Sequence, residues 1–206
     1  MPRLIRRIAP GLRQVRTECF PFRRFEETHG VEVWLGVGGN LGDSVRRFQR
    51  LCRYLDRQSD LRLMESSPIL INPPFGYLDQ PDFANAVLRI RTSLPPLRLL
   101  RRILEIERRF GRRRSFQDAP RTLDIDLLFY GGRRIEDPPR LRVPHPGWKQ
   151  RASVLWPLAQ MRRPGPDARV RRELKPLLTK RLRAPRKILY GSQKAFRGPL
   201  NPKHGH

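Results

Sequence analysis

The chain has 206 residues, 31% of them charged, and its formal net charge at pH 7 is +25. This length predicts one domain with tails, and the charge favours a polyanionic ligand, either a nucleotide or a nucleic acid. No apolar run reaches membrane-spanning length or marks a secretory signal, and the two cysteines have no zinc-site or disulfide-framework spacing, so we expect a cytoplasmic protein.

Residues 1–30 mix arginine with isolated apolar residues. This composition predicts a loosely held basic arm, with one short helix around residues 12–15. Regular structure begins at residues 31–37, which alternate as a strand. A glycine-rich turn over residues 38–42 follows, and Asp43 or Ser44 can cap the next helix, whose apolar face starts at Val45. Such a turn can bind phosphate, but its spacing fits neither common phosphate-loop motif, so an ordinary tight turn is the favoured alternative.

Residues 61–71 read as a second strand and residues 83–92 as a third. Between them, residues 72–81 carry three prolines and a glycine, which predicts a long surface loop. Asn85 lies on the same face of the third strand as Phe83. Its amide suits the edge of a heterocycle, and a structural role in a turn is the alternative.

A helix is predicted over residues 94–110, with Gly111 as its stop. Three arginines follow at 112–114, and Arg121 closes the loop that leads into the next strand. This loop can be a solvated basic segment. Because two carboxylates follow it directly, we favour a clamp for phosphate groups.

Residues 121–130 form a strand rich in branched and aromatic residues. Asp124 and Asp126 share one face of it, and two adjacent carboxylates repel unless a cation lies between them. Mg²⁺ is the cation that such oxygen ligands prefer, and it binds together with substrate phosphates. The alternative is a strand with a solvated polar face. We expect residues 133–135 to pair with this strand as a hairpin.

Prolines make residues 141–146 extended, and His145 stands among basic residues, so it is either structural or a phosphate contact. The sequence of residues 153–158 predicts a short helix. Residues 162–206 carry a net charge of +12, and we expect residues 163–206 to be a weakly ordered tail with one helical turn at Leu174–Leu178, dispensable for catalysis. The predicted parts are therefore an arm, a folded domain over residues 31–162 and a tail.

An ordered set of short motifs spans residues 31–162. It consists of Leu35 to Asp43, Asp79 to Asn85, Ile106-Glu107 with Gly111-Arg112, Pro120 to Asp126, Val143 to Pro146, and Trp156 to Leu158. The set resembles the 6-hydroxymethyl-7,8-dihydropterin pyrophosphokinase family of folate biosynthesis. The resemblance implies a ferredoxin-like α+β fold, with an antiparallel sheet and helices on both sides. It also implies transfer of the pyrophosphoryl group of ATP to the hydroxymethyl group of the pterin, which releases AMP.

The resemblance further implies roles for individual residues, grouped by ligand. They are two Mg²⁺ ions on Asp124 and Asp126, catalytic loop arginines at Arg112 and Arg121, nucleotide contacts from Glu107, Arg114, His145 and Arg151, and pterin contacts from Pro73, Phe75, Phe83 and Asn85. Partners would be these small molecules, with no membrane, and we expect a monomer.

The chain departs from the family pattern at five positions. Asn72 stands where the family often has threonine, Phe83 replaces a frequent tyrosine but keeps the ring, and Asp118 takes the place of a common tryptophan. Gly39 replaces a usual serine, and Ser153 stands where the family commonly has a phenylalanine that stacks on the pterin. Phe75 or Trp148 could supply the missing wall.

Two other functions compete with this interpretation. The first is nucleic-acid binding, since ferredoxin-like sheets bind RNA through aromatic residues, but two aspartates at the sheet centre would repel a phosphate chain. The basic ends leave weak, nonspecific contact open. The second is another metal-dependent transferase such as a nucleotidyltransferase, which would not explain the ordered set of motifs.

Overall fold

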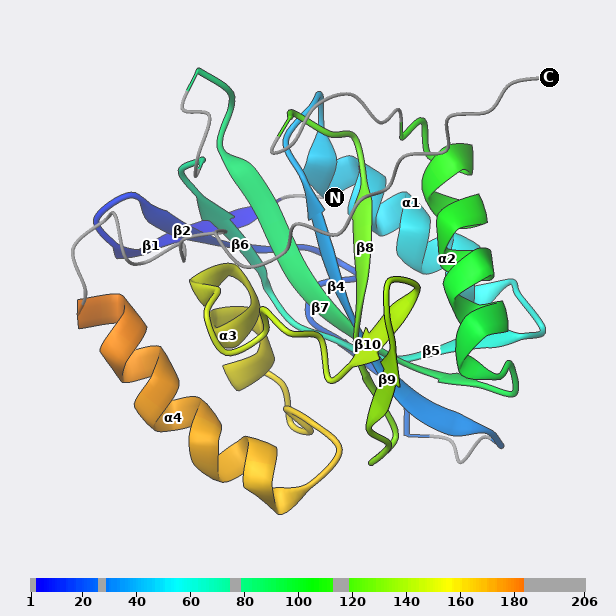
Figure 1. Ribbon diagram of the computed structural model, residues 1–206. Coiled ribbons are helices and arrows are strands. Elements are labelled where there is room, and N and C mark those ends of the chain that lie inside the picture. Colours follow the sequence, from blue (N-terminus) through cyan, green and yellow to red (C-terminus); the bar gives the residue numbers. More distant parts are fainter. Residues whose placement is uncertain (1–2, 26–28, 75–78, 113–118, 184–206) are drawn as a thin grey trace, which may run out of the picture.

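The computed structural model describes residues 3–25, 29–74, 79–112 and 119–183 of the chain. They form an α+β fold in which every pair of neighbouring strands is antiparallel (Figure 1). The strands are β1 (Leu4–Ala9), β2 (Leu12–Arg16), β3 (Phe22–Arg23), β4 (Val31–Gly39), β5 (Leu61–Ser66), β6 (Ile69–Asn72), β7 (Phe83–Thr92), β8 (Asp124–Tyr130), β9 (Ile135–Asp137) and β10 (Leu141–Val143).

The order of the main sheet is β1-β2-β6-β7-β4-β8, so β4 lies between β7 and the edge strand β8. Strand β5 pairs with another part of β7, and β3 pairs with β5. The predictions of strands over 31–37 and 83–92 are confirmed. The strand predicted over 61–71 is two strands, because Ser67-Pro68 interrupts the pairing and proline has no N–H to donate.

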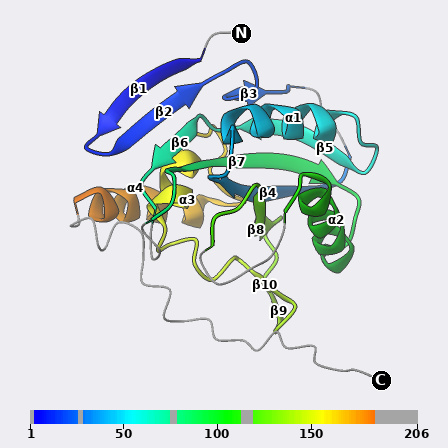
Figure 2. The same ribbon diagram turned by 90° about the horizontal axis from the view of Figure 1, so that it is seen from above.

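Four helices cover the two faces of the sheet: α1 (Ser44–Asp56), α2 (Pro96–Arg109), α3 (Ala152–Ala159) and α4 (Ala168–Arg183). Helices α1 and α2 lie on one face, and α3 and α4 lie on the other (Figure 2). Side chains at alternate positions of the central strands enter the two cores. Val33, Leu35 and Val37 pack toward α1 and α2, whereas Trp34 packs toward α3. The ferredoxin-like α+β expectation is confirmed.

The ends of α1 and α2 follow from local chemistry. The Asp43 side chain accepts a hydrogen bond from Arg46 N at 2.9 Å and so caps α1, as predicted. Pro96 occupies the first turn of α2, where no N–H is missed. Gly111 has a φ of +83°, a conformation that glycine adopts without strain, and ends α2.

The prediction of a helix around residues 12–15 is wrong. Strands β1 and β2 form a hairpin, and β2 pairs with β6 as part of the main sheet. Leu12, Val15 and Phe20 are buried. The arginines that suggested a loose arm are exposed on the hairpin, and so are Leu4 and Ile5 of β1, whereas Leu12 and Val15 of β2 are buried.

The prediction of one helical turn after residue 163 is also wrong, since α4 is a helix of 16 residues. Val170 and Leu174 are buried in the same core cluster as Leu155 and Leu158 of α3. Apolar residues at helical spacing thus give α4 a buried stripe in spite of its many cations. Pro176 lies within this helix. Where the functional domain begins and ends stays a prediction.

A third correction concerns residues 133–143. Strand β9 pairs with β10, not with β8 as expected, so the hairpin stands apart from the main sheet. The short helix predicted over 153–158 is confirmed as α3. None of the helices in the described residues is long and apolar enough to cross a membrane.

Candidate functional site

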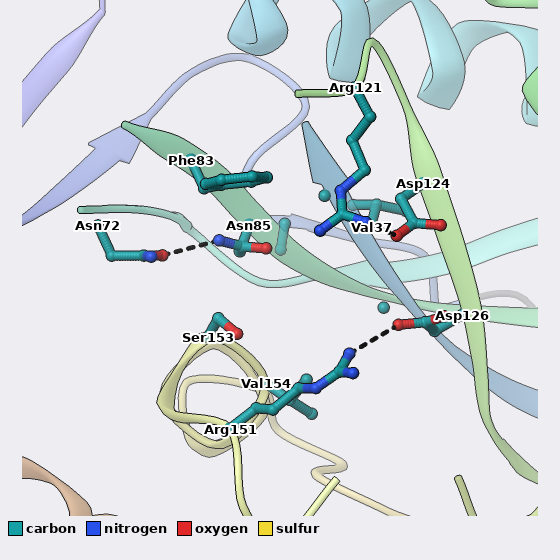
Figure 3. Close-up of a pocket in the computed structure, with 13 residues that line it drawn as sticks. Val37, Asn72, Phe83, Asn85, Arg121, Asp124, Asp126, Arg151, Ser153 and Val154 are labelled. Carbon is teal, nitrogen blue, oxygen red and sulfur yellow. Dashed lines mark hydrogen bonds and ion pairs between the residues drawn. The ribbon is translucent and has the colours of Figure 1, made fainter. Parts of the chain in front are cut away.

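A pocket opens on the α3 face of the sheet, between the central strands and the first turn of α3 (Figure 3). Side chains from β6, β7, β8, α3 and the segment before β8 converge on it. The lining residues are Gly36, Val37, Gly38, Asn72, Phe83, Asn85, Ala86, Arg121, Asp124, Asp126, Arg151, Ser153 and Val154. Six of the twelve residues assigned to the site from the sequence therefore lie together.

The two aspartates reach the pocket because of the strand period. Asp124 and Asp126 alternate with the buried residues Ile125 and Leu127, so their carboxylates share the pocket face of β8. On the neighbouring strand β4, Gly38 and Gly36 are their register partners. Since glycine has no side chain, the space in front of the two carboxylates stays open.

Asp124 is surrounded by arginine. Arg112 donates to its carboxylate, and Arg121 Nη1 lies 3.3 Å from its Oδ2. Arg112 also donates to Glu107, a buried residue of α2 whose Oε1 accepts a hydrogen bond from Ile125 N at 2.7 Å. Burial raises the pKa of Glu107 to about 7, although that hydrogen bond and Arg112 act to lower it. Glu107 of α2 thus contacts both the backbone of β8 and the side chain of Arg112.

Asp126 forms an ion pair with Arg151, whose Nη1 lies 3.3 Å from its Oδ2. Burial raises the pKa of the Asp126 carboxyl, and the neighbouring Asp124 raises it further. No group of three or more His, Cys, Asp or Glu suited to a metal ion occurs among the described residues. Two repelling carboxylates in an open pocket nevertheless fit Mg²⁺, which takes few protein ligands and completes its shell with water and phosphate oxygens.

His145 borders this region from the segment before α3. Burial lowers its pKa, although the nearby Asp126 acts to raise it. Its ring Nδ1 accepts a hydrogen bond from Gly147 N at 3.1 Å. The backbone N–H of His145 donates to Leu128 O at 2.9 Å. The ring is therefore held in place as a neutral imidazole at neutral pH.

The glycine-rich turn after β4 positions Arg121. Asn40 Oδ1 accepts from Arg121 N at 2.9 Å, and Arg121 O accepts from Asn40 N at 2.9 Å. A Cβ on Gly39 would lie 2.4 Å from Thr122 O, so glycine permits this close approach of the two segments. The turn thus braces the Arg121 segment in the structure.

The Arg121 guanidinium lies between an aromatic ring and a carboxylate. Its Cζ is 5.3 Å from the centre of the Phe83 ring, and it points toward Asp124 (Figure 3). This geometry is a cation–π contact. It holds the guanidinium above the pocket, where it faces any phosphate bound at the two aspartates.

The other end of the pocket carries amide groups. Asn85 Nδ2 donates to Asn72 Oδ1 at 2.7 Å, and Asn72 Nδ2 donates to Pro73 O at 2.9 Å. These bonds orient both amides as an array able to pair with the edge of a planar heterocycle. Opposite them stand Ser153 and Val154 of α3 (Figure 3).

Several expectations are not met or not addressed by this geometry. Phe75 and Arg114 lie outside the described residues. Pro73 accepts from Asn72 but does not line the pocket. Trp148 is buried against Phe129, with ring centres 5.2 Å apart, so its ring supplies no wall to the pocket. The expectation that Trp148 replaces the missing aromatic residue is therefore wrong.

The pocket also contains residues that the sequence did not single out. Val154 contributes apolar surface, Val37 borders the pocket as part of β4 between Gly36 and Gly38, and these glycines and Ala86 leave room for a ligand. Small and apolar residues carry no chemical signal in a sequence, and only their place beside Asp126 and Asn85 marks them.

The comparison with known proteins decides the family. A model of the 7,8-dihydro-6-hydroxymethylpterin-pyrophosphokinase family matches residues 34–163. The chain belongs to this family. The match covers the pocket and both aspartates, and it leaves the β1–β2 hairpin and α4 outside.

Individual relatives agree with this assignment. The 2-amino-4-hydroxy-6-hydroxymethyldihydropteridine pyrophosphokinase of Helicobacter pylori is 45% identical over 129 residues, which are 62% of this chain and 78% of the relative. The protein of the same name from Pseudomonas aeruginosa is 40% identical over 138 residues, 67% of this chain and 83% of the relative. A folic acid synthesis protein of Schizosaccharomyces pombe is 33% identical over 135 residues, 66% of this chain and 18% of that protein.

Proposed function

We propose that the pocket between β7, β8 and α3 is where this chain carries out the reaction of its family. That reaction is the transfer of the pyrophosphoryl group of ATP to the hydroxymethyl group of 6-hydroxymethyl-7,8-dihydropterin in folate biosynthesis. The observation that carries the proposal is one juxtaposition. Asp124 and Asp126 share a pocket with Arg121 and Arg151 at one end and with Asn72 and Asn85 at the other.

The carboxylate end suits the triphosphate of ATP. Asp124 and Asp126 would hold Mg²⁺, and we propose two ions, each in contact with phosphate oxygens. Mg²⁺ bound there would neutralise phosphate charge and would lower the pKa of an alcohol that coordinates it. Arg151 and His145 lie beside Asp126 and would contact the nucleotide phosphates.

The amide end suits the pterin. Asn85 offers a donor and an acceptor to its ring edge, and Phe83 offers an aromatic face beside it. Val154 and Ser153 would close the opposite side, and neither of them has the aromatic ring that a phenylalanine provides. We propose that Asn72 extends the amide array, and that Pro73 shapes it through its carbonyl.

Between the two ends, the arrangement brings the hydroxymethyl oxygen next to the phosphates. That oxygen would attack the β-phosphorus and release its proton to solvent, the bond from the β-phosphorus to the α,β-bridging oxygen would break, and AMP would leave with that oxygen. Such a transfer needs alignment and charge stabilisation more than covalent help from the protein. Arg121 and Arg112 both contact Asp124 at this point. We propose that they shift onto the transferred group and stabilise the charge that develops there.

The direct experiment is formation of AMP from ATP and Mg²⁺ with and without 6-hydroxymethyl-7,8-dihydropterin. We expect AMP and the pterin diphosphate in equal amounts, and neither when the pterin is omitted. Release of AMP independent of the pterin would indicate a different acceptor and would argue against this function. A cytoplasmic location, a monomeric state and weak nucleic-acid contact through the basic ends stay predictions.

A further inference from the structure

Helix α3 is apolar on nearly all sides. Six of its eight residues are buried, namely Ala152, Val154, Leu155, Trp156, Pro157 and Leu158. A helix that is hydrophobic all round needs cover on every side, and one this short is not stable alone. The sheet covers one side of α3. Part of its remaining cover comes from segments outside the family match, which spans residues 34–163.

Helix α4 packs against α3 on the side away from the sheet (Figure 1). Val170 and Leu174 of α4 are buried in the same cluster as Leu155 and Leu158 of α3. A second link is polar. Lys149 Nζ, in the segment that leads into α3, lies 2.5 Å from the Glu173 carboxylate of α4.

The chain between α3 and α4 is anchored to the sheet. Glu65 is 2% exposed, and its Oε1 accepts a hydrogen bond from Arg162 N at 2.6 Å. The Trp34 indole donates to Arg163 O at 2.8 Å. At Gly165 a Cβ would lie 2.4 Å from Val170 Cγ1, so the connection passes close to α4. These contacts fix where α4 begins.

The N-terminal hairpin covers a further side of α3. Leu12 of β2 is buried with Leu70 and Trp156, and Ile8 packs against this cluster. Leu178 of α4 packs against the same cluster. The two ends of the described chain therefore meet at Trp156, and between them they enclose α3.

Helix α3 and the residue before it carry one wall of the pocket. Arg151, Ser153 and Val154 face the pocket across from Phe83 and Asn85 (Figure 3). We propose that the β1–β2 hairpin and α4 are positioning elements, which set the distance from this wall to β7 and thereby the fit of the pterin. This inference rests on the proposed function. It is the alternative to the expectation that the C-terminal tail after residue 162 is dispensable for catalysis.

Leu174 is the positioning residue that tests this most sharply, because it is 4% exposed and touches neither substrate nor pocket. We expect Leu174→Ala to raise KM for the pterin by roughly fivefold or more at saturating ATP, with a smaller change in kcat, because a small displacement of a binding group has a large effect. Leu174→Met, which conserves volume, should restore KM. Lys175→Ala, at an exposed position of the same helix, should leave it unchanged.

A matched control separates positioning from loss of stability. Leu55 of α1 is 1% exposed in the core on the opposite face of the sheet, so Leu55→Ala should lower Tm to a similar extent without a change in KM. If Leu174→Ala does not fold, Leu174→Val gives the same comparison with a smaller cavity. If Leu174→Ala and Leu55→Ala had the same KM for the pterin, the inference would be overturned. The proposed function would still stand as long as the wild-type chain formed AMP. Failure of the wild-type chain to form AMP would contradict the function itself.

Discussion

Arg112, which follows α2, donates to the carboxylate of Asp124 on β8. A group proposed to act on the phosphates thus contacts a group proposed to hold Mg²⁺. A cation that binds Asp124 must compete with this guanidinium. The two would therefore be coupled, and Mg²⁺ bound at Asp124, as proposed above, would free Arg112 to act elsewhere.

Replacing Arg112 should affect metal binding and catalysis in opposite directions. We expect Arg112→Ala to bind Mn²⁺, used as a spectroscopic probe for Mg²⁺, about two- to tenfold more tightly in the absence of substrates, because a competing cation is gone. Its kcat should fall by on the order of a hundredfold. Paramagnetic relaxation of water protons measures the first effect. Arg108→Ala, at an exposed position of α2, serves as control, and unchanged Mn²⁺ affinity in Arg112→Ala would refute the coupling.

Arg121 should act chiefly in the transition state. Its guanidinium is already held against Phe83 and Asp124, so its loss should leave ATP binding nearly intact. We expect Arg121→Ala to lower kcat on the order of a hundredfold, with KM for ATP changed by less than about threefold. Steady-state kinetics with varied ATP gives both numbers. A higher KM for ATP at unchanged kcat would assign Arg121 to ground-state binding instead.

Gly39 should not tolerate a side chain. A Cβ there would lie 2.4 Å from Thr122 O, and the segment from Arg121 to Thr122 would have to move. We expect Gly39→Ala to lower the free energy of unfolding by about 1–3 kcal/mol, as overpacking does, and to lower kcat. Gly132→Ala is the matched control, because no atom lies within 4 Å of its Cβ position. Chemical denaturation and kinetics measure the two effects, and equal behaviour of both variants would show that the turn adapts.

The central fold could be predicted because its signals are local. The alternation in residues 31–37, the helical spacing that begins at Val45 and the cap at Asp43 each depend on neighbouring residues only. The same holds for the shared face of Asp124 and Asp126, which follows from the strand period. The family resemblance then indicated the groups that gather around them.

The two ends of the chain could not be predicted for a physical reason. Basic residues stand between their apolar residues and obscure the pattern that would mark a strand or a helix. Leu12 and Leu174 gain their burial from partners distant in the sequence, such as Trp156 and Leu158. The contact of Arg112 with Asp124 and the burial of Trp148 against Phe129 likewise depend on tertiary approach.

Glu65 should be important for stability without taking part in catalysis. Its side chain is 2% exposed, Arg89 Nε lies 3.3 Å from its Oε2, and Arg162 N donates to its Oε1. Without the Glu65 carboxylate, the charge of the Arg89 guanidinium, which is 9% exposed, is less well neutralised. We expect Glu65→Ala to lower the free energy of unfolding by about 3 kcal/mol, measured with urea. Glu105→Ala, from a pair whose carboxylate is 56% exposed, should change it by less than about 1 kcal/mol. If both variants lowered the free energy of unfolding equally, the buried contacts of Glu65 would not be important for stability.

The central claim is that the carboxylate end of the pocket holds the metal for pyrophosphoryl transfer. It is tested most directly by the rate of AMP formation in Asp126→Asn, with ATP, pterin and Mg²⁺ saturating. We predict a loss on the order of a hundredfold or more with unchanged circular dichroism, because the amide keeps the shape of the carboxylate and removes its charge. Asp82→Asn, at an exposed aspartate paired with Arg13, should keep wild-type activity. An Asp126→Asn protein that forms AMP at close to the wild-type rate would contradict the account.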